Sequence, residues 1–533
     1  MKKISILSTL VALLLLSSCD WLNIIPPIDP CEDDDPDCVE PTPSELDVYD
    51  RGTPYATYST NFNALFDPSN EIKLELEMSQ GAILKMQQFG SNTGYQKYSD
   101  VYWPTDVKIT INEDVHEFEE VGIRIKGNTS KTPFIDEDGN FFMNAHFKLD
   151  FTETFDDTED AEYAEVVEGY QHDWTGDKVG KDARKARRLF DMEKLDIKWN
   201  KSDDKTHTRQ AYAYKTFRDL GLASLHSNLS DFTLTNTDNG DTMHGVFEIL
   251  ETVDEIFIER NYTSSQVGGD VYKTTYTGMG PANFTKTNTF DFNNNTKVAT
   301  IIEGGKVGAE NERRDYYPSY DIKTNKKKTT HADLANLFGK VYDDEKNLAT
   351  AKEKLESAIE MDQFLRFSAI CALLGNPDDQ RQNDNNYYLF FPKGSKKAIY
   401  IPYDYDWCLG LAWDNTEGSD PYRAGVSNSP FTLKSLYGET QNPLYYRVFN
   451  NKTGSSNRHS SYPVIKEYKD KYAYYLVNYM DFILNQGRFE EYVNKFATND
   501  NTSSNISSYI TAKRAAVVKG LRDEGYGTLL DAQ

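Results

Sequence analysis

The sequence predicts an α+β protein with a β-rich N-terminal half and a mainly helical C-terminal half. Residues 70–150 contain segments in which apolar and polar residues alternate, which is the period of a strand with one buried face. From residue 333 onward, apolar residues recur every three or four positions, the period of an amphipathic helix. The chain has 533 residues, more than one compact core usually holds, so we expect at least two lobes.

The first 19 residues have the pattern of a secretory signal. Lys2 and Lys3 precede a short apolar run, and small residues precede Cys19. The run is too short to cross a bilayer as a permanent helix. A cysteine at the cleavage point resembles the lipobox of bacterial lipoproteins, which implies a lipid on Cys19 and an extracytoplasmic protein anchored at the outer membrane or cell surface. The alternative is an ordinary secretory signal.

Residues 20–45 are rich in Pro, Asp and Glu and cannot bury enough apolar surface to fold, so we expect a tether. Cys31 and Cys38 lie inside it and are able to form a small disulfide in an oxidising compartment. Cys371 and Cys408 lie in apolar, aromatic stretches and are expected to pack as small hydrophobic side chains rather than to bind metal.

The charge of the chain argues against nucleic acid as a partner. The formal net charge is −26, and no dense basic stripe offsets it. No second long apolar run follows the signal, so we expect only the lipid to hold the chain to a membrane.

The N-terminal half contains a pattern that suits phosphate binding. An alternating strand over 121–125 runs into a turn at Lys126 and Gly127, and a further strand over 145–151 carries Lys148 on the face opposite its apolar residues. A glycine-bearing turn followed by a strand lysine is how a nucleotide-binding lobe covers and holds phosphates. The alternative is an exposed hairpin with a solvated lysine.

The remaining elements follow from local patterns. Residues 155–188 are acidic and then basic and predict an irregular insertion. A helix is expected from Thr206 to Leu220, and a hairpin over 231–254 turns at Asp238, Asn239 and Gly240. Long loops are expected over 280–330, and mainly helical segments over 333–367, 462–496 and 510–520.

A helix that stops at Gly375 is followed by a loop rich in Asp and Asn, and then by an aromatic hairpin that leads into Asp404. Carboxylate and amide oxygens suit Mg²⁺ or Ca²⁺ better than zinc. Asp378 and Asn383 have the spacing of the carboxylate and amide in a kinase catalytic loop, and a metal-binding Asp is expected downstream. The alternative is a solvated polar loop.

Several short segments match, in order, the motifs of one known family. They are residues 122–130, 146–151, 208–221, 244–254, 269–273, 375–378, 386–389 and 401–407. Through them the chain resembles the CotH kinase-like family (spore coat protein H type), which comprises atypical secreted or surface protein kinases. The resemblance covers roughly residues 70–412.

The resemblance implies a two-lobed atypical protein-kinase-like fold that uses ATP with Mg²⁺ or Mn²⁺. It divides the chain into a β-rich N-lobe with the insertion 155–188, a C-lobe with the catalytic and metal loops, and a C-terminal helical extension. These parts span residues 46–260, 261–440 and 441–533.

Carried over position by position, the resemblance assigns roles to individual residues. Asp378 is the catalytic carboxylate, and Asp404 holds the metal, with Asn386 or Asn383 as the second ligand and Asp406 nearby. The phosphates contact Lys148, helped by Arg124 or Lys126. The segment from Glu248 through Glu251 to Asp254 lies at the hinge and reads adenine mainly through backbone groups. At position 126 the family usually has Arg, and Lys loses the bidentate contact with phosphate.

Two functions follow from this reading. The first is a lipid-anchored kinase that phosphorylates Ser and Thr of extracytoplasmic proteins, or of itself. The second is a catalytically inactive, kinase-like binding or structural lipoprotein for protein or glycan adhesion, in which Asp378, Asp404 and Asp406 hold a structural cation. A kinase needs Lys148, Asp378 and Asp404 to converge on one site, whereas a binding module needs only a rigid surface.

Overall fold

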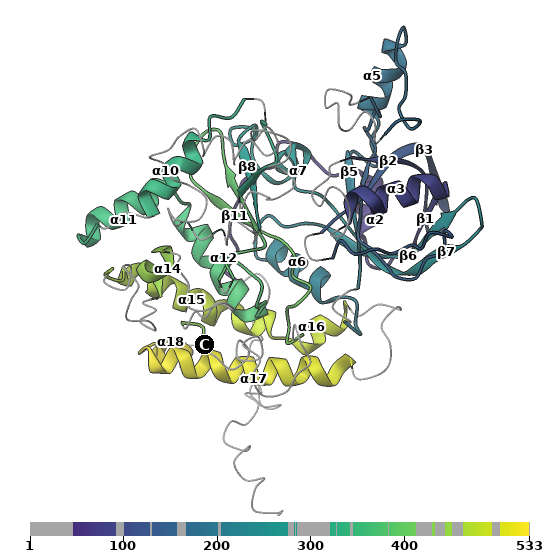
Figure 1. Ribbon diagram of the computed structural model, residues 1–533. Coiled ribbons are helices and arrows are strands. Elements are labelled where there is room, and N and C mark those ends of the chain that lie inside the picture. The colour runs from purple at the N-terminus through teal and green to yellow at the C-terminus, as the bar shows by residue number, and fades with distance from the viewer. Residues whose placement is uncertain are drawn as a thin grey trace, which may run out of the picture. The chain divides into compact units, whose positions relative to one another are not determined.

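Seven strands of the N-terminal half close into a barrel (Figure 1). The order around it is β1-β2-β3-β4-β5-β7-β6, and the parallel pairing of β1 with β6 closes it. The strands are β1 (Ile72–Met78), β2 (Trp103–Ile111), β3 (Asp114–Ile125), β4 (Phe147–Asp150), β5 (Lys194–Trp199), β6 (Ser227–Asn236) and β7 (Thr242–Leu250). The other neighbours in the barrel pair antiparallel.

These features belong to a computed structural model. It describes residues 46–91, 101–127, 130–156, 167–200, 204–275, 282, 284, 320–326, 328–341, 345–381, 383–411, 429–431, 443–449, 462–492 and 502–531. The predicted signal, the lipidation site Cys19, the tether and the pair Cys31 and Cys38 lie outside the described residues. None of the helices among these ranges is long and apolar enough to cross a membrane.

Alternation of apolar and polar residues decides which side chains fill the barrel. In β1 the residues Ile72, Leu74, Leu76 and Met78 are buried, while the residues between them are partly or fully exposed. Helix α3 (Gln80–Gly90) begins at the N-cap Ser79 and packs on β2 and β3 with its apolar face. Helix α2 (Thr60–Phe66) packs on β6. Because the apolar residues of these strands point into the barrel, the polar residues that alternate with them lie on its outer face.

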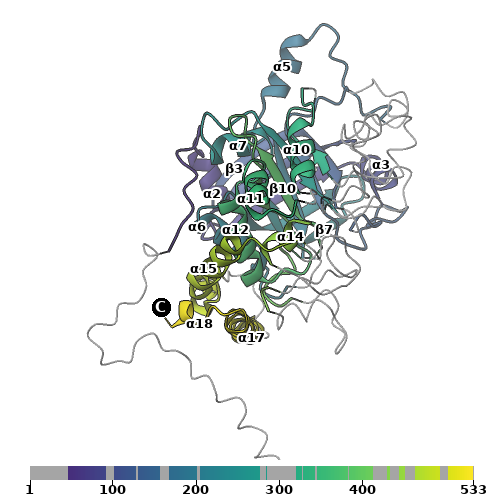
Figure 2. The ribbon, with the colours of Figure 1, turned by 90° about the vertical axis from the view of Figure 1, so that its left-hand side faces the viewer.

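A second sheet has the order β11-β10-β8-β9, and all its pairings are antiparallel. Its strands are β8 (Asp270–Thr274), β9 (Tyr320–Ile322), β10 (Tyr387–Phe391) and β11 (Ile399–Pro402). Helix α12 (Met361–Leu374) contacts β11 and packs on α15 (Lys466–Ile483), so it is buried along its whole length (Figure 2). The loop that leaves α12 therefore starts from a fixed point.

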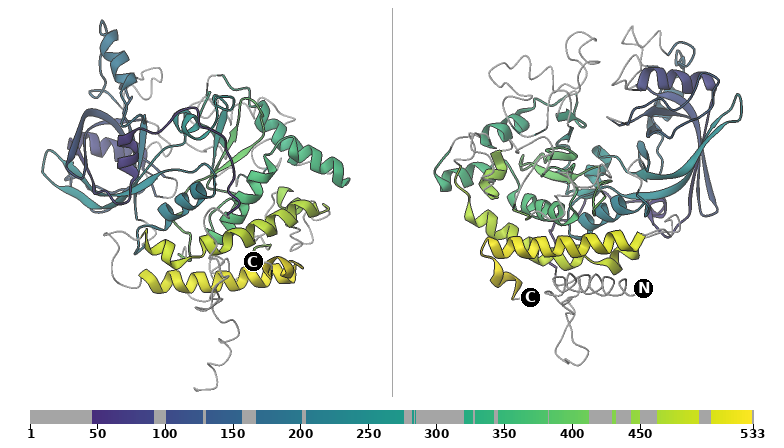
Figure 3. Two further views of the ribbon diagram at one scale, coloured as in Figure 1. Left: turned by 180° about the vertical axis from the view of Figure 1, so that it is seen from behind. Right: turned by 60° about the horizontal axis from the view of Figure 1, so that its bottom comes forward.

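The other helices surround these two sheets. Helix α6 (Arg209–Asp219) contacts both β6 and α12, and α7 (Glu255–Asn261) follows β7. The long α17 (Thr502–Asp523) lies against α15 and α16 (Figure 3). The remaining helices are α5 (Lys178–Ala186), α10 (Ala332–Val341), α11 (Leu348–Glu356), α14 (Pro443–Val448), α16 (Gln486–Glu490) and α18 (Gly527–Leu530).

The α+β prediction is confirmed, and the closed barrel is a finding that the sequence did not predict. The insertion 155–188 is not wholly irregular, because it contains α5, which stands away from the barrel in Figure 1. Cys371 and Cys408 are buried and free, as expected. Residues 48–533 cluster into one compact unit, and the boundaries expected at 260 and 440 stay predictions.

Candidate functional site

The outer face of β3, β4, β5 and β7 carries a row of charged side chains. Cross-strand pairing places Arg124 opposite Lys148, and Lys148 opposite Asp196. Two residues farther along β5, Lys198 lies opposite Glu248 of β7. The intervening apolar residues point into the barrel, so the alternation of each strand turns these charges to one common face.

Three lysines gather around one carboxylate, and we call Lys126, Lys148 and Lys273 with Asp196 the lysine cluster. The Nζ atoms of Lys126 and Lys148 lie 2.6 and 3.3 Å from the oxygens of Asp196. Lys126 also donates to the Tyr403 hydroxyl at 3.2 Å, and the ammonium of Lys273 lies 4.1 Å from the centre of the same ring. The cluster therefore has more ammonium groups than carboxylates.

The pKa values of the two lysines Lys148 and Lys273 are lowered, and that of Asp196 is lowered as well. Burial lowers the pKa of Lys148 to about 8. Burial, together with the charges of Lys126 and Lys323, lowers the pKa of Lys273 to about 7. Burial raises the pKa of Asp196, but the two paired lysines outweigh it and hold that pKa well below its usual range. An anion bound here would restore charge balance to the lysine cluster.

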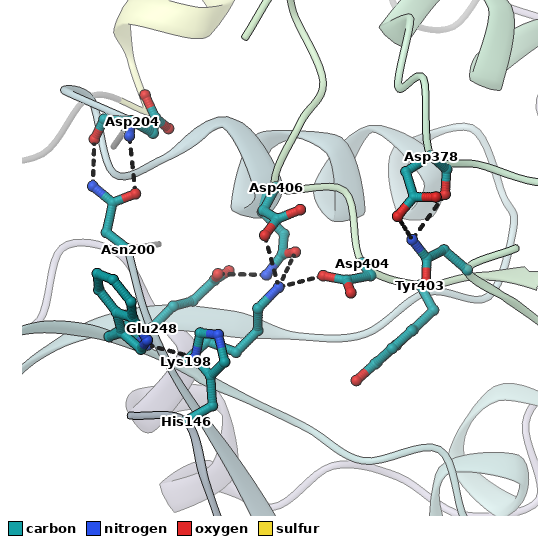
Figure 4. Close-up of polar contacts among 12 residues, drawn as sticks. His146, Lys198, Asn200, Asp204, Glu248, Asp378, Tyr403, Asp404 and Asp406 are labelled. Atoms are coloured by element: carbon teal, nitrogen blue, oxygen red, sulfur yellow. Dashed lines mark hydrogen bonds and ion pairs between the residues drawn. The ribbon is translucent and has the colours of Figure 1, made fainter. Parts of the chain in front are cut away.

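Asp404 and Asp406 follow β11 and meet Lys198 from the barrel (Figure 4). The Lys198 ammonium pairs with Asp404 and lies 3.5 Å from Asp406. Asp404 has a left-handed backbone with φ 58°, and its N–H donates to the Tyr214 hydroxyl at 2.9 Å. The carboxylate of Asp404 is thus held toward the barrel, and the residue before it, Tyr403, contacts the lysine cluster.

Asp378 lies in the loop that leaves α12. Its carboxylate accepts hydrogen bonds from the side-chain amides of Asn383 at 2.5 Å, Asn385 at 3.2 Å and Asn386 at 2.9 Å. Burial, together with the charges of Asp404 and Asp406, raises the pKa of Asp378 to about 7, and the hydrogen bonds from the amides oppose this rise. The three carboxylates are therefore close enough to interact electrostatically.

Asn376 connects the two loops. Its Nδ2 donates to the backbone carbonyl of Asp404 at 3.0 Å, and its Oδ1 accepts from the backbone N–H of Asp378 at 3.1 Å. This side chain is fully buried. One amide thus fixes the positions of Asp378 and Asp404 relative to each other.

The oxygen donors fit a divalent cation. Within the described ranges no three His, Cys, Asp or Glu side chains surround a common point. Asp404 and Asp406 nevertheless lie together, and the buried Oδ1 of Asn383 accepts no hydrogen bond from any residue that the structure describes. Asn386, the other predicted ligand, instead donates to Asp378. Carboxylate and amide oxygens are the donors that Mg²⁺ and Mn²⁺ prefer.

A shallow hollow that is open to solvent lies beside Lys198. Glu248 lines it, and its buried Oε1 accepts no hydrogen bond from any described residue, while its Oε2 accepts from Gln210 at 2.5 Å. Burial raises the pKa of Glu248 to about 7. The hollow is lined by Lys198, Trp199, Asn200, Asp204, His207, Gln210, Leu229, Val246, Glu248 and Asp406.

One of the predicted nucleotide-binding residues is placed differently. Glu251 does not line the hollow: it contacts His226 at 2.9 Å and lies near Arg218 and Arg260 in a separate buried cluster. Arg124 lies opposite Lys148, and its guanidinium lies over the ring of Tyr102, 5.3 Å from its centre. The predicted residues that the structure does bring together are Arg124, Lys126, Lys148, Glu248, Asn383, Asn386, Asp378, Asp404 and Asp406.

The sequence reading missed several residues of this site. They are Asp196, Lys198, Gln210, Lys273, Asn376 and Tyr403. Four of them lie inside the matched motifs, although no role was assigned to them: Gln210, Lys273, Asn376 and Tyr403. Asp196 and Lys198 alternate with apolar residues in β5, and this pattern alone does not separate a buried charge from a solvated one.

Comparison with known proteins supplies the family. No curated protein shows significant similarity to the chain. The sequence model of the family described as CotH kinase protein matches residues 171–516, which contain Asp196, Lys198, Asp378 and Asp404 as well as most of the C-terminal helices. Because this match spans more than half of the sequence, the chain belongs to the CotH kinase protein family.

Proposed function

We propose that the protein is an ATP-dependent kinase that transfers the γ-phosphate to Ser or Thr hydroxyls of extracytoplasmic proteins, or of itself. One observation carries the proposal: the lysine cluster and the carboxylates of Asp378, Asp404 and Asp406 meet on one face of the barrel. Tyr403 contacts the lysine cluster and directly precedes Asp404, while Lys198 reaches from the barrel to both Asp404 and Asp406.

The lysine cluster would hold the phosphates. Lys126 and Lys148 extend from the β3–β4 region of the barrel, and both are largely buried. Three ammonium groups against one carboxylate favour a multiply charged anion such as a polyphosphate. The open hollow at Lys198 adjoins this region and would take another part of the nucleotide, with Glu248 on its wall.

Asp404, Asp406 and the free Oδ1 of Asn383 would hold Mg²⁺ or Mn²⁺. The cation, when bound, neutralises charge on the phosphates. In its absence Lys198 supplies the compensating positive charge to Asp404 and Asp406. The rigid loop after α12 and the Asn376 link keep these oxygens in place, so little reorganisation would accompany binding.

Asp378 would orient the acceptor hydroxyl and take its proton. Three side-chain amides fix the direction of its carboxylate. A pKa of about 7 in the protein without ligand suits a group that accepts a proton near neutral pH. In this role Asp378 must be ionised when the hydroxyl attacks.

The proposal includes a two-lobed kinase-like architecture. In it, the barrel corresponds to the N-lobe, and the second sheet with its helices corresponds to the C-lobe. The segment after β7, which leads into α7, would be the hinge. The proposal also keeps the lipid on Cys19 and an extracytoplasmic location at a membrane surface, which would make secreted or surface proteins the acceptors.

A binding or structural lipoprotein is the second candidate. The observation that favours it is the ion pair of Lys198 with Asp404, which satisfies the acidic residues without any cation. In this case the buried charges would stabilise the fold and no phosphate would be transferred.

Nucleotide binding by a protein that lacks the first 45 residues separates the two candidates. A ligand that binds only the native state raises the melting temperature. We expect ATP with Mg²⁺ or Mn²⁺ to raise it by several degrees, and Lys148→Met and Asp404→Asn to abolish the rise. A rise that survives both substitutions, or none in the wild type, overturns the kinase assignment. Incubation with radiolabelled ATP and a Ser/Thr-rich protein, with Asp378→Asn as control, then tests transfer.

A further inference from the structure

We propose that Lys273 is a further phosphate-binding residue, which contacts the nucleotide's polyphosphate from the four-stranded sheet while Lys126 and Lys148 contact it from the barrel. The inference rests on the proposed function and extends it, because neither the motifs nor the family match assigns a role to this side chain. The phosphates would then be contacted from both sheets, by Lys126 and Lys148 from the barrel and by Lys273 from the four-stranded sheet.

Lys273 lies on β8, an inner strand of the four-stranded sheet. It pairs with Tyr388 of β10 in the middle of the sheet, and Tyr388 packs edge-to-face on Tyr403 with ring centres 5.3 Å apart. The ammonium of Lys273 lies over the ring of Tyr403, whose hydroxyl accepts a hydrogen bond from Lys126. Lys273 and Lys126 therefore approach the same aromatic side chain from two different sheets.

Lys273 differs from the other lysines of this region in its ionic partners. Lys126 and Lys148 share Asp196, and Lys198 has Asp404. Among the described residues no carboxylate lies within 4.0 Å of the Lys273 ammonium, and no oxygen accepts a hydrogen bond from it.

Asp321 would be the natural partner of Lys273, because it lies directly opposite on β9. Asp321 pairs instead with Lys323. Among the described residues the partly buried Lys273 ammonium contacts the Tyr403 ring and no carboxylate oxygen. Such a site is energetically costly for a positive charge, and a bound anion would remove that cost.

The surrounding charges agree with an anion site. Lys126 from the barrel and Lys323 after β9 repel the Lys273 ammonium, whereas Asp196 and Asp404 attract it. Burial and the two lysines outweigh the carboxylates and lower its pKa to about 7. A polyphosphate next to Lys273 would raise that pKa, so binding near pH 7.5 would be coupled to proton uptake.

Titration calorimetry with Mg²⁺–ATP and with inorganic tripolyphosphate tests the proposal. We expect Lys273→Met to weaken the binding of both ligands at least tenfold. The matched control is Lys393→Met, which removes an exposed lysine just beyond β10 of the same sheet and is expected to leave both affinities unchanged. Repeating the titrations in buffers of different ionisation enthalpy at pH 7.5 gives the number of protons taken up.

Lys273→Arg provides a second test in case Lys273→Met misfolds. Arginine keeps the positive charge but is always protonated, so this variant is expected to bind tripolyphosphate with less proton uptake than the wild type. Wild-type affinity and wild-type proton uptake in Lys273→Met overturn the role of Lys273 and leave the kinase proposal intact. If the wild-type protein binds neither ATP nor tripolyphosphate, the proposed function fails, and this inference fails with it.

Discussion

The side chains of Lys198 and Asp404 form an ion pair across 206 positions of the sequence. It joins strand β5 of the barrel to the loop after β11, and only 10% of the Lys198 side chain is exposed. Burial lowers the pKa of Lys198, but Asp404 and Asp406 outweigh it and raise that pKa above its usual value. Burial raises the pKa of Asp404, but Lys198 lowers it more, so Asp404 is ionised at neutral pH. The pair thus holds two opposite charges together at the junction of the barrel and the loop after β11.

Removing the lysine of this pair is expected to destabilise the protein and to favour a cation. Lys198→Met leaves Asp404 and Asp406 without compensation, and breaking a buried ion pair of this kind costs about 3 kcal/mol. We expect this loss in urea unfolding at pH 7, and we expect Mn²⁺ to stabilise Lys198→Met more than the wild type. The double variant with Asp404→Asn is expected to recover most of the loss. Equal stability of Lys198→Met and wild type would show that the pair contributes nothing.

The ionisation of Asp378 predicts a pH dependence. Its pKa is about 7 in the folded protein and near 3.9 in an unfolded chain, so between these values the folded state binds more protons. The Asp378 contribution to stability is therefore present at low pH and is lost as pH rises to about 7. We expect Asp378→Asn, which carries no charge, to lose less stability than the wild type between pH 5 and pH 8. Parallel curves of urea midpoint against pH would contradict this.

The periodicity of the sequence predicted the α+β class and the strands, but not the barrel. Closure depends on the parallel pairing of β1 with β6, in which Leu74 lies opposite Phe232. A pairing between segments so far apart leaves no local pattern, because each strand alternates in the same way whether its neighbour is present or not. The pairing of β1 with β6, and with it the closure of the barrel, is therefore visible only in the structure.

Site residues were predictable from the sequence where they directly follow the end of a helix or of a strand. Asp378 follows a helix stop, and Asp404 follows an apolar strand, and both positions are visible in the sequence. Lys198 and Lys273 were not found, because a lysine that alternates with apolar residues looks the same whether it is solvated or buried against a second sheet. Glu248 and Glu251 were predicted together, yet their side chains enter different clusters, because Glu248 lies within β7 whereas Glu251 follows the last residue of that strand.

Glu248 and Glu251 give a paired test of where the nucleotide lies. Glu248→Gln changes the wall of the hollow, so we expect a change of threefold or more in ATP affinity. Glu251→Gln alters only the cluster with His226 and is expected to lower the melting temperature while it leaves the affinity unchanged. Both dissociation constants come from one calorimetric series. If instead Glu251→Gln changes the affinity and Glu248→Gln does not, the adenine of the nucleotide binds near Glu251 rather than in the hollow.

Gly375 ends α12 and starts the loop that carries Asp378, so its backbone conformation controls the position of the Asp378 carboxylate. It has a left-handed conformation with φ 66°, and a Cβ atom there would overlap the hydroxyl of Tyr509, which donates to the carbonyl of Leu373 at 2.7 Å. Gly375→Ala therefore combines backbone strain of about 1 kcal/mol with a steric clash.

We expect Gly375→Ala to unfold at lower urea concentration than wild type and to transfer phosphate more slowly, because displacement of the loop moves Asp378. Gly176→Ala is the matched control, because Gly176 also has a positive φ of 83° but, apart from its chain neighbours, no described residue has an atom within 4 Å of the added Cβ. The difference between the two variants measures the clash alone. If both lose the same stability and Gly375→Ala keeps full activity, Tyr509 does not constrain the loop and the position of Asp378 depends on Asn376 instead.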